Sequence, residues 1–314
     1  MKLSIVIPAY NVEDFIGRCL NSVLVPECFC YDIEVIIVND GSEDNTFKIM
    51  HDYASKYENI RILSQDNSGL SHTRNVGLNQ ASGDYVWFVD SDDSIYGNVY
   101  AKLFELFEND YDVIALTAEI DRNEGYGQLP ANRGTLSEGV CSAWELFKNG
   151  YIYPYSGAPF YVFKTTFLKQ NNLSFREGLF YEDLLFTPLW FCKFPSVYHL
   201  KDVAYTYYVR KGSIINSSIT PKKLRDILTV SDILWSYQQQ YPSNSMQARI
   251  LSISIVGICT AFYTNFYKKS PKGADKVKAV NLFWERNYWL NALVMSGKYK
   301  YLIRLFQLYI AKFL

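Results

Sequence analysis

Residues that bind metals or form disulfides are few and scattered in this sequence. There are three histidines, at positions 51, 72 and 199, and six cysteines, at positions 19, 28, 30, 141, 192 and 259. The cysteines lack the paired spacing of a zinc site, and the histidines form no cluster. Reduced thiols in the cytoplasm are the simplest interpretation. We also expect no signal peptide, because Pro8 breaks the first apolar run and Glu13 and Asp14 follow it.

An excess of charge of one sign is lacking as well, and no internal repeat is visible. The 314 residues carry 31 Lys and Arg against 32 Asp and Glu, which argues against nucleic acid as a partner. The uncharged stretch 250–267 approaches the length of a membrane span, but Ser, Thr and Asn recur along it, which favours a buried helix. The chain is long enough for one large α/β domain with appendages, or for two domains.

Strands and helices alternate at short spacing in the first part of the chain. Apolar runs predict strands at 3–9, 34–38, 60–64 and 85–89, and amphipathic stretches predict helices at 12–24, capped by Asn11, 45–57 and 70–81. This alternation is typical of right-handed βαβ units and a parallel sheet. After residue 93 the pattern is less regular. We expect a helix at about 98–109, a strand at 112–118 and a short helix at 142–149. From Pro221 the pattern becomes mostly helical, at 222–240, 245–267, 275–294 and 298–313.

Polar and acidic residues follow three of the predicted strands. These segments are Pro8-Ala9-Tyr10-Asn11, Asn39-Asp40-Gly41-Ser42 and Asp90-Ser91-Asp92-Asp93. The carboxyl ends of parallel strands meet at one edge of a sheet, where open α/β sheets bind ligands. Two carboxylates at such an edge can hold a hard divalent cation, and that cation can hold a diphosphate.

These segments resemble glycosyltransferase family 2. The resemblance rests on residues 4–11, residues 38–42, Asn67-x-Gly69-Leu70 with Arg74-Asn75-x-Gly77, and residues 88–93. The resemblance is close over residues 1–95, weaker from there to about residue 215, and absent in the C-terminal helices. It implies an α/β fold of GT-A type, with a Rossmann-like, mainly parallel sheet flanked by helices and a C-terminal helical extension. Residues 1–216 would be the nucleotide-sugar-binding catalytic domain, and 217–314 a helical region that associates with membrane.

The resemblance implies nucleotide-binding roles for the strand ends. Asp40 would accept a hydrogen bond from the uracil N3–H, and Tyr10 would lie against the base. Arg74 would meet the nucleotide or its phosphates, with a surface salt bridge as the alternative. The remaining members of the predicted set shape the nucleotide floor or lie near the ribose, and they are Pro8, Ala9, Asn11, Asp90 and Ser91.

The same resemblance implies a metal ion and a catalytic base. Asp92 and Asp90 would ligate Mn²⁺ or Mg²⁺, which neutralises charge on the leaving nucleoside diphosphate; Asp93 could assist or replace Asp92. Asp183 would be the general base, and Glu182 would bind or orient the acceptor. The alternative for this pair is an acidic helix N-terminus, which the helix dipole favours. With one base and no second nucleophilic carboxylate, a single displacement would invert the anomeric configuration.

Two later segments leave alternatives open. Arg210 lies in Tyr208-x-Arg210-x-Gly212, which resembles a family element that closes over the diphosphate; an exposed basic turn is the other interpretation. From Lys268 onwards there are ten basic and two acidic residues, and 297–314 is amphipathic. Such a helix can lie on an anionic membrane surface, or it can pack on the helical bundle.

Together these features predict a metal-dependent inverting glycosyltransferase that moves a sugar from a UDP-sugar to a hydroxyl of a glycan or lipid-linked glycan. We expect it in bacterial surface polysaccharide assembly, in the cytoplasm or peripheral on the inner face of the plasma membrane. A nucleotidyltransferase is one alternative, but residues 8–11 are not the Gly-rich phosphate loop it needs. A non-catalytic, membrane-tethered glycan-binding protein is another, against which Asp40, Asp90, Asp92 and Asp183 speak.

Overall fold

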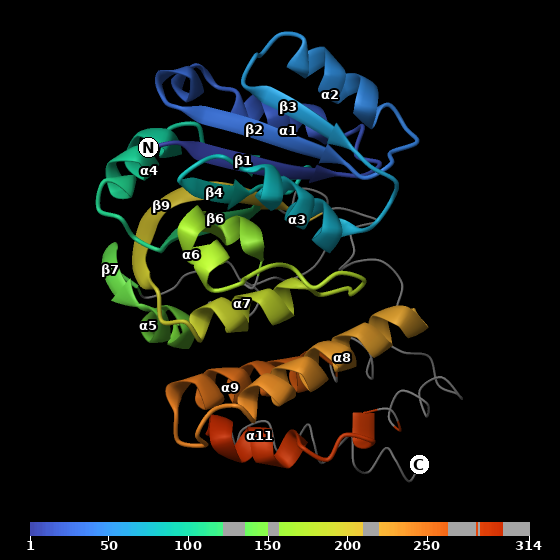
Figure 1. The fold of residues 1–314 in the computed structure, drawn as a ribbon, viewed down its shortest axis with the longest axis vertical. Helices are drawn as coiled ribbons and strands as arrows, with labels where there is room; N and C mark the ends of the chain where they lie inside the picture. Colours follow the sequence, from blue (N-terminus) through green and yellow to red (C-terminus); the bar gives the residue numbers. More distant parts are fainter. Residues whose placement is uncertain (122–135, 150–156, 210–219, 263–280, 282, 298–314) are drawn as a thin grey trace. The chain divides into compact units, whose positions relative to one another are not determined.

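The protein forms two compact units. A computed structural model describes residues 1–121, 136–149, 157–209, 220–262, 281 and 283–297 (Figure 1). The first unit takes its described residues from Met1–Gly178 and Lys193–Asn216, and the second from Leu179–Cys192 and Ser217–Leu314. The catalytic domain predicted from the sequence includes 179–192, whereas the packing groups this segment with the second unit.

The first unit is built on a nine-stranded sheet. Its strand order is β3-β2-β1-β4-β8-β6-β9-β5, with β7 paired to β9. Within β3-β2-β1-β4 all neighbours are parallel, whereas β8, β5 and β7 run antiparallel to their partners. The strands are β1 (Leu3–Ala9), β2 (Ile33–Asn39), β3 (Ile60–Ser64), β4 (Tyr85–Phe88), β5 (Ser94–Ile95), β6 (Val113–Asp121), β7 (Gly139–Ser142), β8 (Tyr161–Lys164) and β9 (Ser196–Tyr208).

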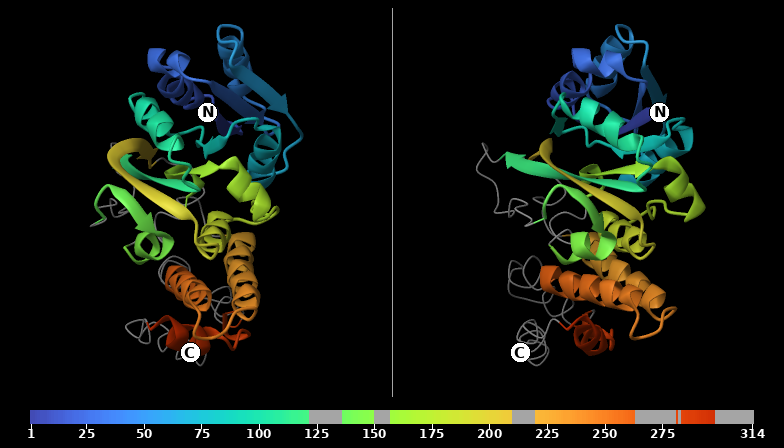
Figure 2. Two further views of the ribbon diagram at one scale, coloured as in Figure 1. Left: turned by 60° about the vertical axis from the view of Figure 1, so that its left-hand side comes forward. Right: turned by 90° about the vertical axis from the view of Figure 1, so that its left-hand side faces the viewer.

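The parallel strands are where the sequence predicted them. β1 and β3 have the predicted bounds, β2 is one residue longer at each end, and β4 is one residue shorter at its carboxyl end. Every residue of β1 and of β4 is buried, as expected for strands covered on both faces. The curl of the sheet lies further along, where β6 pairs in parallel with β9: the register shifts at Leu116/Thr117 and again at Thr117/Ala118, and β9 is strongly curved (Figure 2).

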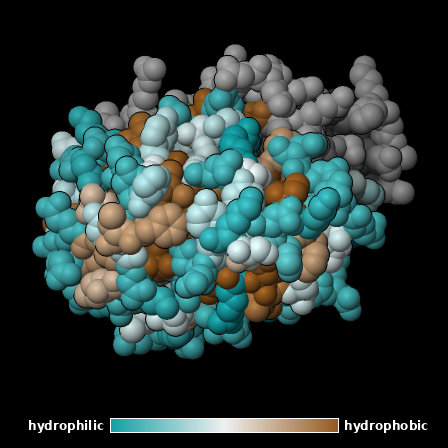
Figure 3. All heavy atoms as spheres, turned by 90° about the horizontal axis from the view of Figure 1, so that it is seen from above, coloured by the Kyte–Doolittle hydropathy of each residue, from teal (hydrophilic) through white to brown (hydrophobic). Residues whose placement is uncertain are grey.

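Helices cover both faces of the parallel strands. α1 contacts α2, and α3 contacts β1 and β2. Because parallel crossovers are right-handed, the strand order puts α1 and α2 on one face and α3 on the other. On the α2 side the surface is mainly hydrophilic, with scattered hydrophobic groups (Figure 3). The helices of this unit are α1 (Ile16–Val23), α2 (Thr46–Ala54), α3 (Leu70–Gln80), α4 (Val99–Phe107), α5 (Ala143–Lys148) and α6 (Thr165–Gln170), with 3-10 turns at Pro26–Cys30 and Ala158–Phe160.

The first helix starts later than the sequence predicted. α1 begins at Ile16, with Phe15 as its N-cap, so Asn11 is not the cap. The intervening backbone is instead held by side chains from the loop before α2 and from the first residue of α2. Val12 N donates to Thr46 Oγ1 (2.8 Å) and Glu13 N donates to Asp44 Oδ2 (3.1 Å). These bonds satisfy backbone donors that a longer helix would have used.

The described residues of the second unit form mainly helices, and side-chain caps fix the starts of two of them. Its helices are α7 (Asp183–Phe191), α8 (Pro221–Gln238), α9 (Met246–Ala261) and α11 (Trp289–Ser296). Thr220 caps α8 through Lys223 N, and Ser245 caps α9 through Ala248 N. α9 contacts α7, α8 and α11 and is mostly buried (Figures 1 and 2). This confirms the buried helix expected at 250–267, as far as residue 261.

No helix in the described ranges combines the length and apolar character needed to cross a membrane. The helix predicted at 275–294 is interrupted in its described part: residues 281, 283 and 284 are helical, a turn follows at 285–288, and α11 begins at Trp289. Two side-chain contacts explain the turn: Trp289 Nε1 donates to Phe283 O (2.9 Å), and Arg286 forms a two-pronged bond to Asp232 (2.6 and 2.7 Å). The helix predicted at 298–313 lies outside the described residues.

A glycine sets the distance between α3 and the sheet. A Cβ on Gly77 would lie 2.2 Å from Cγ1 of Val6, a stiff, buried side chain of β1. We expect Gly77→Ala to lower the free energy of unfolding of this unit by about 1–3 kcal/mol, measured by urea denaturation. Gly17→Ala, in α1, is the matched control, because a Cβ at this position would have Tyr53 Oη, 3.8 Å away, as its only neighbour within 4 Å. That variant should be neutral or more stable by up to about 1 kcal/mol. An equal change in the free energy of unfolding for Gly77→Ala and Gly17→Ala would contradict the close approach of α3 to β1.

Candidate functional site

The ends of β1, β2 and β4 lie at one edge of the sheet. β1 ends level with β2, pairing Ala9 with Asn39, and β4 pairs with β1 up to Val6 and Phe88. The backbone contacts continue past the strands, since Asp40 N donates to Ala9 O (2.9 Å). β1 also separates β2 and β3 from β4, so the strand order reverses beside it. That reversal is where doubly wound sheets bind ligands.

The segments after β1 and β2 are tied to each other. Asn11 has a φ of 49°, a left-handed conformation that Asn tolerates better than most residues. Its backbone N donates to Ser42 Oγ (3.1 Å), and its side-chain oxygen accepts from Glu43 N (2.9 Å). Asn11 therefore fixes the loop, while the preceding Tyr10 is left 46% exposed, with its ring open to a ligand. Pro8 and Ala9 are buried as the last residues of β1.

Asp40 organises the loop that begins α3. Its carboxylate is 3% exposed and accepts three hydrogen bonds, from Gln65 Nε2 (2.7 Å), Ser68 N (2.8 Å) and Gly69 N (2.9 Å). Gly69 is the N-cap of α3 and has a φ of 88°. A carboxylate has about four lone-pair positions, so these bonds leave room for one further donor.

Arg74 is a buried partner of Asp90. The arginine side chain is 1% exposed, and its Nη2 donates to Asp90 Oδ1 (2.8 Å); the side chain of Asp90 is 27% exposed. The guanidinium carbon lies 5.1 Å from the ring centre of Phe175. Asn75 fixes that residue, because Phe175 N donates to Asn75 Oδ1 (2.9 Å) and Asn75 Nδ2 donates to Phe175 O (2.8 Å). Arg74 is thus neither a surface salt bridge nor an exposed cation, and it holds Asp90 in place.

α3 connects these two groups. Gly69, bonded to Asp40, and Arg74, bonded to Asp90, are five residues apart. Five residues of α-helix rise about 7.5 Å. The carboxylates after β2 and after β4 are therefore fixed to opposite ends of one short helical segment.

Asp93 points into the protein. It is fully buried and accepts from Tyr205 Oη (2.6 Å) and from Tyr208 N (2.9 Å). Burial raises the pKa of this carboxyl well above its usual range, and the neighbouring charges of Asp92 and Asp90 raise it further. Asp92 is only partly buried, and Ser91 is 6% exposed.

Arg18 is a site residue that the sequence did not indicate. Its Nη2 donates to the backbone oxygen of Asp92 (2.5 Å), and its guanidinium lies 3.5 Å over the ring of Tyr208. On the sequence it is an ordinary charge on the exposed side of α1. Tyr205 was missed for a similar reason, and so was the bond from Tyr208 to Asp93, because no local pattern links β9 to a loop more than a hundred residues earlier.

The donor set fits a hard divalent cation shared with a ligand. Within the described residues there is no group of three or more His, Cys, Asp or Glu side chains that could hold a metal ion. Asp90 and Asp92 nevertheless offer carboxylate oxygens at the same loop. Mg²⁺ is commonly held by one or two carboxylates together with substrate phosphates. Asp93 is less suited, because both of its oxygens already accept bonds.

Glu182 and Asp183 are at the start of α7, in the second unit. Glu182 is 6% exposed, and its backbone oxygen accepts from Leu185 N (3.0 Å) and Phe186 N (2.8 Å). Asp183 is the first helical residue and is partly exposed. The helix dipole by itself favours carboxylates at this position. Arg210 lies outside the described residues.

The strand order, with the acidic loop after β4, defines a GT-A fold. The crystal structure of residues 1–349 of S. aureus TarS in complex with UDP-GlcNAc superimposes with a TM-score of 0.72, over 93% of this chain and 81% of that chain, at 24% identity. Residues 4–175, more than half of the chain, match the model of Glycosyl transferase family 2. The chain belongs to this family, which confirms the resemblance seen in the sequence.

Several curated relatives are similar over about 68–73% of the chain. The uncharacterized glycosyltransferase YibD of Escherichia coli is 31% identical over 68% of this chain, and the uncharacterized glycosyltransferase EpsJ of Bacillus subtilis is 32% identical over 70%. Poly(ribitol-phosphate) beta-N-acetylglucosaminyltransferase TarS of Staphylococcus aureus is 30% identical over 73%. The aligned part spans 63%, 64% and 39% of these relatives, which is less than two thirds of their length.

The loop-holding role of Asp40 can be tested by removing its charge. We expect Asp40→Asn to lower the free energy of unfolding of the first unit by about 1–3 kcal/mol, because an amide NH₂ would face donors that now bond a carboxylate. Urea denaturation measures the change. Asp66→Asn, an exposed neighbour in the same loop, is the control and should be neutral. An unchanged stability of Asp40→Asn would show that the three bonds do not hold the loop.

Proposed function

We propose that the protein is a metal-dependent, inverting glycosyltransferase that moves a sugar from a UDP-sugar to a hydroxyl of a glycan or lipid-linked glycan. The observation that carries this proposal is the gathering of Asp40, Asp90 and Asp92 after β2 and β4, at the edge where the strand order reverses. Family membership supports the reaction class. Structures of TarS with UDP-GlcNAc and with UDP support the class of donor.

The uridine side of the donor would lie at the ends of β1 and β2. The exposed ring of Tyr10 is available to stack on the base, above the floor of Pro8 and Ala9. The remaining acceptor position on Asp40 suits the uracil N3–H. The ribose would lie near Ser91 and Asp90, whose carboxylate Arg74 orients from behind.

Asp92 and Asp90 would hold Mn²⁺ or Mg²⁺ together with the diphosphate. When bound, the cation supplies positive charge to the leaving nucleoside diphosphate without a proton transfer. The chain's own contribution is to hold the acidic loop still. Arg18 bonds its backbone, and Tyr205 and Tyr208 anchor Asp93 beneath it.

The acceptor hydroxyl would lose its proton to Asp183, with Glu182 orienting the acceptor. The hydroxyl oxygen forms a bond to the anomeric carbon as the bond from that carbon to the diphosphate oxygen breaks. The electron pair leaves with the nucleoside diphosphate. One displacement inverts the configuration, so an α-linked donor gives a β-linked product.

The place of action that we propose is bacterial surface polysaccharide assembly at the cytoplasmic face of the plasma membrane. The basic, amphipathic segment 297–314 would rest on anionic lipid headgroups. Arg210 would separately contact the diphosphate of the donor. Relatives named as poly(ribitol-phosphate) transferases support a cell-envelope glycan as the acceptor class.

The metal and the donor are tested by thermal unfolding. Saturating UDP with Mn²⁺ should raise the Tm by several degrees. A ligand at about a hundred times its Kd raises the free energy of unfolding by about 2.7 kcal/mol. Asp92→Asn should lose most of this shift, whereas Asp52→Asn, on the exposed side of α2, should keep it. An equal shift in EDTA would contradict metal-dependent binding. No shift under any condition would favour the non-catalytic glycan-binding alternative.

The base is tested by a charge-removing variant. We expect Asp183→Asn to lower the transfer rate by about 10²–10⁴-fold, because the acceptor proton has no carboxylate to move to. The protection by UDP and Mn²⁺ should stay unchanged. Asp202→Asn, in an exposed ion pair with Lys102, should transfer normally. A normal rate for Asp183→Asn would refute the assignment. NMR of the product, showing retained anomeric configuration, would refute inversion.

A further inference from the structure

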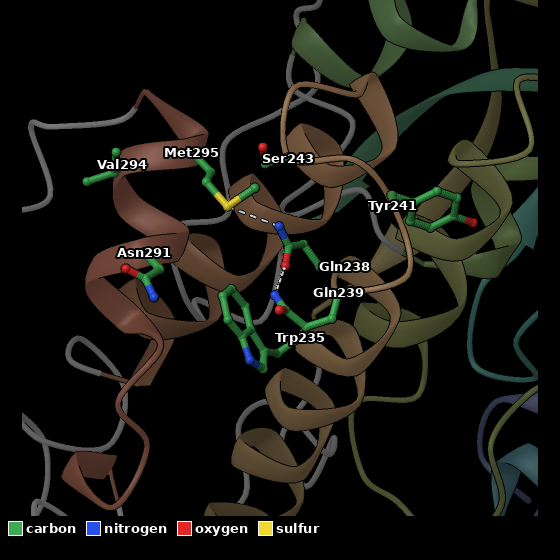
Figure 4. Close-up of a pocket in the computed structure, with 8 residues that line it drawn as sticks. All are labelled: Trp235, Gln238, Gln239, Tyr241, Ser243, Asn291, Val294 and Met295. Atoms are coloured by element: carbon green, nitrogen blue, oxygen red, sulfur yellow. Dashed lines mark hydrogen bonds between the residues drawn. The ribbon is translucent and has the colours of Figure 1, made fainter.

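The second unit contains a pocket that the proposed reaction does not use. Its volume is about 350 Å³, and it is lined by the last turn of α8, the residues that follow, and α11 (Figure 4). None of its eight lining residues is charged. From α8 and the residue that follows it come Trp235, Gln238 and Gln239, and from α11 come Asn291 and Met295.

Trp235 gives the pocket a rigid aromatic wall. One face of its ring stacks on Tyr288, with ring centres 5.0 Å apart and planes 13° from parallel. Tyr288 is itself fixed, because its hydroxyl bonds Ser231 (2.8 Å) and Asp232 Oδ1 (2.6 Å). Trp235 is only partly buried. An indole supported in this way offers a flat apolar surface at little cost in side-chain entropy.

Gln238 supplies a buried amide with a weak partner. It is 2% exposed, and its Nε2 donates to Met295 Sδ (3.0 Å). Figure 4 shows these two side chains pointing toward one another from α8 and α11. Its oxygen accepts from Gln239 Nε2. A thioether is a poor acceptor, so a ligand oxygen in its place would satisfy the amide better. Methionine is flexible enough to move aside.

Asn291 adds a second amide from the opposite helix. It is exposed on α11, and its side chain makes no hydrogen bond to the described residues. An amide donates and accepts at once, which suits neighbouring hydroxyl groups that do the same. The pocket thus combines one aromatic wall with several amides.

We propose that this pocket binds a neutral saccharide. Without a cationic side chain it has nothing to recognise a phosphate or nucleotide. Its amides are unsuited to an alkyl chain, because burying them against one would leave them unpaired. The volume is within the range of ligand pockets. Binding itself is independent of the transfer reaction; its use for a sugar unit of the acceptor glycan rests on the function proposed above.

The test is a titration of the full chain with lactose, maltotriose and N,N′-diacetylchitobiose, followed by tryptophan fluorescence and saturation-transfer NMR. We expect saturable binding of at least one with a Kd of about 1–10 mM. Asn291→Ala should weaken it by about 3–10-fold, the loss of one or two hydrogen bonds. Trp235→Ala should abolish it. Tyr237→Ala, the exposed aromatic next to the pocket on α8, is the matched control and should bind normally.

Absence of saturable binding for all three sugars would overturn the proposal, as would an equal loss in Asn291→Ala and Tyr237→Ala. Failure of Trp235→Ala to fold would leave Asn291→Ala as the deciding variant. UDP with Mn²⁺ serves as the independent readout of the first unit. Saccharide binding without UDP protection would support the pocket and refute the proposed transfer. UDP protection without saccharide binding would support the proposed transfer and refute the saccharide pocket.

Discussion

The ion pair between the buried Arg74 and the partly exposed Asp90 is the contact on which the candidate site depends. A guanidinium that is 1% exposed has lost its hydration, so its charge must be met within the protein. Removing the partner of a buried charge is strongly destabilising, because the remaining charge is left uncompensated. Because Arg74 is on α3 and Asp90 follows β4, the pair locks a helix to the end of a strand. Asp40 holds the start of the same helix, so the pair also fixes the distance between the two carboxylates.

Negative charge at this edge is stabilised from several sides. Asp90, Asp92 and Asp93 are close enough that the first two raise the pKa of the third. Two arginines supply the opposite charge: Arg74 donates to the carboxylate of Asp90, and Arg18 donates to the backbone oxygen of Asp92. Asp93 is turned inward against two tyrosines. Asp90 and Asp92 remain partly exposed, and carboxylates suit a hard cation, which is the physical basis of the proposed metal dependence.

The two units differ in the chemistry they offer. The strand edge of the first unit is acidic and tightly hydrogen-bonded, whereas the pocket of the second is uncharged, with an indole wall and amide groups. A charged nucleotide and a neutral sugar call for different surroundings, because phosphate needs compensating charge and hydroxyls need paired donors and acceptors. The proposals for the two units therefore rest on separate observations and can fail separately.

By itself the sequence determined the parallel strands, the order of the motifs and the family. β1 and β3 were predicted to the residue, because a run of buried apolar residues is a local signal. The tertiary structure decided the rest. It buried Arg74, turned Asp93 onto Tyr205, brought Arg18 under Asp92, delayed α1 to Ile16 and broke the helix expected at 275–294. Each of these depends on a partner distant in the chain, and a local pattern carries no information about which distant donor or acceptor a side chain will meet.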